Sequence, residues 1–144
     1  MIKHIVLAAA AAFLFAGPAQ AESWYRIAVT DTAGTYIDAD SITRRGDEAT
    51  AIMSRIWITP IETGMVSSLT RYGIRCSDRS YIALNRTSFR GDGSSDSWIP
   101  AQTREFATDQ TVIHSVILFV CGDRSLRTRV ASPEADARPP GGGK

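Results

Sequence analysis

Two cysteines, Cys76 and Cys121, are the residues of this sequence whose chemistry is most informative. They permit one intrachain disulfide, and the alternatives are a redox pair or a metal site. They do not form a Cys-x-x-Cys motif, and the sequence after residue 21 holds a single histidine, too few for the usual zinc ligand sets. We therefore predict a structural disulfide, provided that the chain reaches an oxidising compartment.

Other residues with catalytic or metal-binding chemistry are scattered along the sequence. His114 lies in an apolar segment, where a core or helix-surface histidine is the simpler interpretation. Asp38 and Asp40 would share one face of a strand, but they lie between two predicted turns, where carboxylates commonly cap backbone amides. The loop 91–96 is rich in glycine and aspartate but lacks the spacing and the bidentate acid of an EF-hand. We predict no catalytic residue, no metal site and no cofactor.

Residues 1–21 have the pattern of a cleavable export signal. Lys3 supplies a positive charge, residues 5–16 are apolar, and a Gly-Pro pair precedes Ala-Gln-Ala, an ending that signal peptidase accepts. Cleavage is predicted between Ala21 and Glu22. The apolar run is shorter than the roughly 20 residues of a membrane-spanning helix, so no transmembrane segment is expected in the mature chain. No cysteine follows the run to accept a lipid.

The charge of the chain is balanced. The whole sequence carries 16 basic and 15 acidic residues, so removal of Lys3 with the signal leaves a formally neutral mature chain. Such a chain has no bulk attraction to nucleic acid, and we predict no nucleic-acid binding. We expect a periplasmic or secreted protein with one domain at residues 22–130. Prolines and a run of glycines predict a disordered tail at residues 131–144.

Alternation of apolar and polar residues predicts a series of antiparallel strands. Turn sequences rich in Gly, Asp and Ser separate them, and Gly46 lies where a positive φ is needed. Proline confines the last strand to an edge of the sheet. The predicted strands are 24–29, 36–42, 50–59, 66–76, 80–89 and 98–100.

The segment 109–121 combines two conflicting signals. Its β-branched residues favour a strand, but Val112, Val116 and Val120 repeat every fourth residue, as in a helix. We predict a helix, with Asp109 as its N-cap and Gly122 just beyond its C-terminus.

Residues spread from Ser23 to Gly122 are the basis of a family resemblance: Trp24, Tyr36-Ile37-Asp38, Ser41-Ile42, Arg55-Ile56-Trp57, Ser68, Cys76, Tyr81, Trp98, Pro100 and Cys121. In the order of these residues along the sequence, the chain resembles the surface-adhesin protein E-like domain family of Gram-negative bacteria. The resemblance implies an α+β fold, with an antiparallel sheet of about six strands and one C-terminal helix tied onto one face by the disulfide. The family's namesake is a lipid-anchored outer-membrane adhesin that binds host extracellular proteins. This sequence departs from it because no cysteine stands at the predicted cleavage site.

One helix covers only one face of a sheet, so the other face is a candidate for interaction. The residues expected to face the helix are Tyr25, Ile27, Val29, Ile52, Ile56, Tyr72, Ile74, Cys76, Ile82 and Leu84. The opposite face then combines arginines with aromatic residues, which are enriched at interface hot spots. The predicted interaction face consists of Trp24, Arg26, Arg55, Trp57, Arg71, Arg75 and Tyr81. The alternative is a solvated face on which arginine stems cover the aromatic rings.

Two functional hypotheses follow. The first is a non-catalytic exported module of the cell envelope that binds a protein partner, or a second copy of itself, through this face. The second is an envelope enzyme or metal-dependent factor with a site in the loop Gly91 to Trp98. The single histidine and the neutral charge of the mature chain favour the first.

Overall fold

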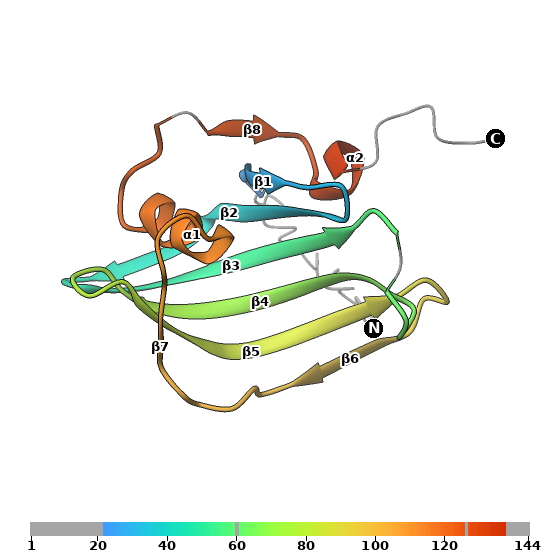
Figure 1. Cartoon of the computed structure of the whole chain (residues 1–144), viewed down its shortest axis with the longest axis horizontal. Coiled ribbons are helices and arrows are strands. Elements are labelled where there is room, and N and C mark those ends of the chain that lie inside the picture. The colour runs from blue at the N-terminus through green and yellow to red at the C-terminus, as the bar shows by residue number, and fades with distance from the viewer. Residues whose placement is uncertain (1–21, 60, 126, 138–144) are drawn as a thin grey trace, which may run out of the picture.

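The computed structural model describes residues 22–59, 61–125 and 127–137. Within these ranges the strands form one antiparallel sheet in the order β6-β5-β4-β3-β2-β1-β8, with β7 also paired to β5. Figure 1 shows how the strands and helices are arranged. Their bounds are β1 Trp24–Val29, β2 Ala33–Arg45, β3 Glu48–Trp57, β4 Met65–Arg75, β5 Ser80–Arg90, β6 Ser95–Trp98, β7 Glu105–Phe106, α1 Val112–Val120, β8 Thr128–Val130 and α2 Pro133–Ala137.

The mainly antiparallel sheet with a helix is confirmed, and the described ranges hold more elements than the sequence predicted. Strands β1 to β5 lie within a few residues of their predicted bounds. The predicted edge strand is shifted to β6, while β7, β8 and α2 were not predicted. The predicted signal peptide and its cleavage residue Ala21 lie outside the described residues.

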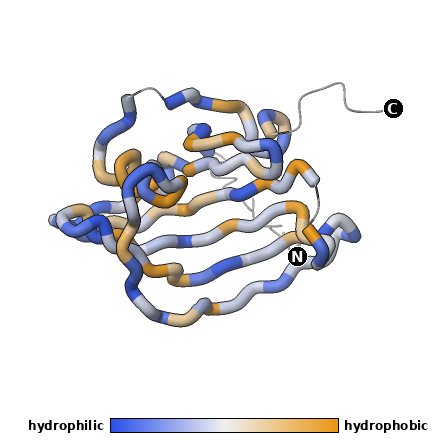
Figure 2. Tube along the Cα trace, viewed as in Figure 1, coloured by the Kyte–Doolittle hydropathy of each residue, from blue (hydrophilic) through white to orange (hydrophobic). Residues whose placement is uncertain are grey.

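Helix α1 covers one face of the sheet, called here the α1 face. Its residues Val116, Ile117, Phe119 and Val120 are buried. They pack with side chains of the α1 face, among them Ile27, Ile37, Met53, Tyr72 and Ile74. The ring of Phe119 lies 5.2 Å from that of Tyr25, between their centroids. Figure 2 shows apolar residues along α1 and the strands, and hydrophilic turns at the end of the sheet drawn on the left.

The predicted helix is confirmed, but its N-cap is not Asp109. The side chain of Thr111 caps the helix and accepts a hydrogen bond from the amide of His114 at 3.2 Å. Threonine is a favoured N-cap. The helical spacing buries Val116, Ile117 and Val120, and this burial outweighs the preference of β-branched residues for strands. Gly122 lies just beyond the C-terminus of the helix, as predicted, and has the positive φ, 118°, that this position favours.

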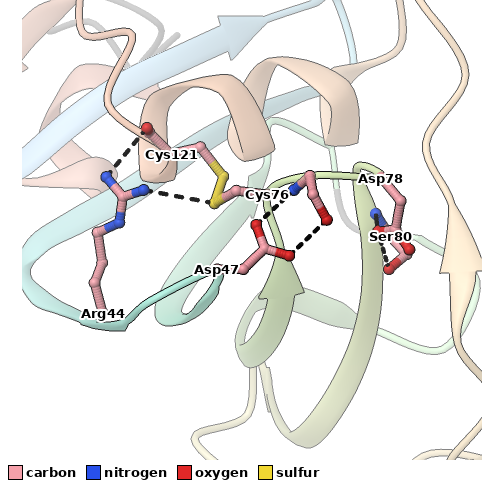
Figure 3. Close-up of a disulfide and its surroundings, with 7 residues drawn as sticks. Arg44, Asp47, Cys76, Asp78, Ser80 and Cys121 are labelled. Carbon is pink, nitrogen blue, oxygen red and sulfur yellow. Dashed lines mark hydrogen bonds between the residues drawn. A yellow bond between two sulfur atoms is a disulfide. The ribbon is translucent and has the colours of Figure 1, made fainter.

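The disulfide between Cys76 and Cys121 ties the end of α1 to the turn after β4. Figure 3 shows how polar groups surround it. Arg44 donates a hydrogen bond to the carbonyl of Cys121 at 3.1 Å. Asp47 accepts a hydrogen bond from the amide of Ser77 at 2.8 Å. The disulfide therefore fixes the end of the helix to the turn after β4, and Asp47 joins that turn to the one between β2 and β3.

The second face of the sheet, called here the α2 face, is covered in part by residues 127–137, the C-terminal strap. Strand β8 pairs with β1, and α2 packs on β1, β2 and β3. The cluster between the strap and the sheet contains Trp24, Tyr36 and Ile56 of the strands and Ala137 of α2. The predicted disordered tail is thus wrong for residues 131–137, which belong to the folded domain, while residues 138–144 lie outside the described residues.

Replacing both cysteines with serine tests how much the disulfide contributes to stability. The link spans 45 residues of sequence. Because it limits the unfolded ensemble, its loss is expected to lower the free energy of unfolding by about 4 kcal/mol, measured by urea titration of Cys76→Ser/Cys121→Ser. The wild-type chain reduced with dithiothreitol is the control and should match the variant. A loss below about 1 kcal/mol would contradict this structural role.

Candidate functional site

The seven residues of the predicted interaction face lie on both faces of the sheet. Residues paired across antiparallel strands share a face. Trp24 pairs with Asp38, Asp38 with Ile52, and Ile52 with Arg71, and this row lies on the α2 face. The prediction of a single face is therefore wrong: Trp24, Arg26, Arg71 and Arg75 lie on the α2 face, and Arg55, Trp57 and Tyr81 lie on the α1 face.

The register of the hairpin after β4 explains the displacement of Tyr81. The strands pair Arg75 with Ser80 and Ile74 with Tyr81. The four-residue turn between them contains Arg79, which has a φ of 54°. A one-residue change of register moves every side chain of a strand to the other face. The prediction had placed Ile82 and Leu84 on the α1 face, and the structure places them on the α2 face beside Gly73.

The four members on the α2 face do not form one exposed aromatic surface. Trp24 is buried, with 7% of its surface exposed, and donates from Nε1 to Glu22 at 2.8 Å. Arg75 forms ion pairs with Glu48 and Asp78. On the α1 face, the guanidinium of Arg55 lies 5.6 Å from the ring centre of Trp57, so the alternative of a self-covering surface holds for this pair.

Asp136 of α2 attaches the strap to the sheet. It accepts hydrogen bonds from Arg26 Nε at 2.7 Å and from Tyr36 Oη at 2.9 Å, and it forms an ion pair with Arg26. The hydroxyl of Tyr36 reaches Asp136 over Gly34, where an added Cβ would lie 2.5 Å from Tyr36 Oη. Gly34 therefore leaves the space that the ring of Tyr36 occupies.

These contacts set the protonation of the groups involved. The hydrogen bonds from Arg26, more than any other cause, hold the pKa of Asp136 below its ordinary value, and burial opposes them. Burial, together with the hydrogen bond to Asp136, raises the pKa of the Tyr36 hydroxyl. The attachment is thus a charged one, with Asp136 ionised and Tyr36 neutral at ordinary pH.

A groove lies between the strap and the α2 face, and we call it the α2 groove. It has a volume of about 600 Å³, within the usual range of ligand pockets. Trp24, Leu69 and Phe89 give it an apolar lining, and Pro133 lies in the wall that the strap provides. The full lining is Glu22, Trp24, Ser54, Ser67, Leu69, Phe89 and residues 131–134.

Sequence reasoning missed the strap, although a local signal marks α2. Ser132 stands before Pro133, and Glu134 and Asp136 follow in the first turn. Serine at an N-cap, proline at the first helical position and acids in the first turn together indicate a helix start. In the structure, the Ser132 hydroxyl accepts a hydrogen bond from the amide of Ala135 at 3.1 Å.

The polar residues considered for catalysis or metal binding make contacts with their own neighbours. In the Gly91 to Trp98 loop, Asp92 accepts hydrogen bonds from Ser94, and Asp96 forms an ion pair with Arg90. His114 Nε2 lies 3.2 Å from Arg79 Nη1. Asp38 accepts a hydrogen bond from the amide of Asp40 at 3.0 Å, and both residues lie within β2, where its register with β3 shifts, and not in a turn.

Among residues 22–59, 61–125 and 127–137, no three His, Cys, Asp or Glu side chains gather as metal ligands. In the same ranges, no helix is long and apolar enough to cross a membrane.

Comparison with known protein families finds no matching family, and comparison with curated proteins finds no match. Comparison with solved structures finds a similarity to Haemophilus influenzae protein E, with a TM-score of 0.45 and 14% sequence identity. The alignment covers 60% of this chain and 79% of that chain. Membership of the surface-adhesin protein E-like family stays a prediction.

Removing the charge of Asp136 tests the attachment of the strap. Near neutral pH, Asp136→Asn is expected to lower the free energy of unfolding by about 1–2 kcal/mol, because a partly exposed charged hydrogen bond is lost. Glu134→Gln, on the exposed side of the same helix, is the control and should change stability little.

The effect of Asp136 on stability should depend on pH. Its pKa is lower in the folded chain than in the unfolded chain, so between the two values the unfolded chain binds more protons and stability rises with pH. Asp136 makes its full contribution to stability above about pH 4, the usual pKa of an unfolded aspartate. This contribution is lost as the pH falls through the lower pKa that Asp136 has in the folded chain. Urea titrations at several pH values should therefore show the wild type and Asp136→Asn converging in acid. A constant gap across this range would count against the attachment.

Proposed function

We propose that this chain is an exported, non-catalytic protein of the cell envelope that binds a partner protein in the α2 groove. The groove itself carries the proposal, because it places apolar side chains from three strands beside a wall formed by residues 131–134 of the strap. A hollow of about 600 Å³ accommodates a few side chains of a partner, not a whole protein surface. We therefore expect an extended segment of the partner to lie in it.

The lining of the groove defines the segment that it would accept. Leu69 and Phe89 are half-buried, so part of each side chain remains available to an apolar anchor residue. Burying such an anchor removes apolar area from water and is the usual source of affinity at a hot spot. Ser54 and Ser67 supply hydroxyl groups that fix its orientation.

The charge at the rim of the groove defines a second property of the partner segment. Glu22 and Glu134 both line the groove and are exposed, and neither forms an ion pair with another residue in the described ranges. Two carboxylates at the rim favour a partner with lysine or arginine beside its apolar anchor, mainly through faster association and selectivity. The proposed partner segment thus combines one large apolar residue with a basic neighbour.

Export and the lack of catalysis are parts of the same proposal. A disulfide fits an oxidising compartment, and the export signal predicted at residues 1–21 would deliver the chain there. The carboxylates of Asp92, Asp96 and Asp136 and the ring of His114 all serve contacts that hold turns or elements together. These contacts favour a binding module over the enzyme of the second hypothesis.

Photo-crosslinking in the native host tests the proposed function. Benzoylphenylalanine replaces Ser67, which lines the groove, or, as the control, Arg55, which is exposed on the α1 face. A discrete adduct is expected with the probe at position 67 and not at position 55. Its component from this chain should begin at Glu22, which tests cleavage of the signal.

A second variant links the adduct to the rim of the groove. Adding Glu134→Lys to the Ser67 probe should reduce the yield of adduct several-fold, because the exposed substitution reverses the charge that faces the partner. An adduct with twice the mass of the chain would identify the partner as a second copy. Equal yields at the two probe positions, or no adduct at position 67, would overturn the proposal.

A further inference from the structure

The α2 face has a second hollow, away from the strap, which we call the Gly73 hollow. The strands pair Gly73 with Thr50 in β3 and with Ile82 in β5, whereas the strap packs near Ile56. The hollow has a volume of about 480 Å³. It is separate from the α2 groove, and the two hollows share no lining residue.

The floor of the Gly73 hollow is apolar because Gly73, at its centre, has no side chain. A Cβ at position 73 would lie 3.2 Å from Ile82 Cγ2 and 3.6 Å from Leu84 Cδ1, so Ile82 and Leu84 come close to the backbone of β4. Both side chains are only half-buried. They leave an apolar surface open on a face that α1 does not cover.

Positive charge dominates the rim of this hollow. Arg45 and Arg104 line it together with one acid, Glu48. The carboxylate of Glu48 is shared, at 3.0 Å from Arg75 Nε and 3.8 Å from Arg104 Nη2. Arg45 is exposed and forms no ion pair with any residue in the described part of the chain. Its guanidinium is therefore available to an anion.

We propose that the Gly73 hollow binds a single-chain amphiphile with a carboxylate head group, such as a fatty acid. Its acyl chain lies on Ile82 and Leu84, and its carboxylate pairs with Arg45. The assignment follows from complementarity: an apolar floor takes a hydrocarbon chain, and a guanidinium binds a carboxylate through two parallel hydrogen bonds. A neutral amphiphile would leave Arg45 unused, and a cationic one would meet like charge.

Titration with dodecanoate below its micelle concentration tests this site, with amide chemical shifts recorded by NMR. Shifts are expected to concentrate at Gly73, Ile82 and Leu84. Dodecyl maltoside, with the same chain and a neutral head, should bind about tenfold more weakly or not at all. The protein used is the mature chain with its disulfide intact.

Two variants and one control separate the contributions of the ligand's head group and of its acyl chain to binding. Arg45→Glu, at the exposed end of β2, should weaken dodecanoate binding at least tenfold. Leu84→Ala should weaken it several-fold by shrinking the floor. Arg55→Glu makes the same charge change on the other face and should leave binding unchanged. Absence of shifts at the three amides, equal binding of the maltoside, or an unchanged affinity in Arg45→Glu would overturn the proposal.

Discussion

The contact of Asp136 with Arg26 and Tyr36 is the interaction on which the arrangement of the α2 face depends. It joins α2, at the end of the described chain, to β1 and β2, which begin the domain. Without this contact, a helix of five residues would have little to hold it, because so short a helix is not stable by itself in water. The strap in turn covers Trp24 and Ile56 and provides one wall of the α2 groove.

Coverage of the two faces is unequal, and this inequality gives the domain its candidate sites. Helix α1 is tied down by a disulfide and packs on the α1 face through four buried side chains. The strap covers only the part of the α2 face near β1 to β3. The rest of that face carries half-buried apolar residues such as Leu69 and Leu84 between arginines. The α2 groove and the Gly73 hollow lie at the two ends of this partly covered surface.

The sequence allowed several local features to be predicted because each has a local physical signal. The strands follow from alternation, α1 from its four-residue repeat, and the disulfide from two cysteines in a chain with a predicted export signal. The candidate site could not be predicted in the same way. Alternation shows that Ile52 and Met53 point to opposite faces, but it does not show which face α1 covers. Ile52 and Ile56 are apolar because the strap lies over them, and the strap itself is marked only by the short signal at Ser132-Pro133.

The C-terminal strap is a structural part of the domain and covers part of the α2 face. The most direct test compares the free energy of unfolding of a mature chain ending at Ala137 with that of one ending at Val130. A loss of about 3 kcal/mol or more is expected on the further truncation, because Trp24, Tyr36 and Ile56 lose their cover and Arg26 loses its partner. Equal stability of the two chains would contradict it.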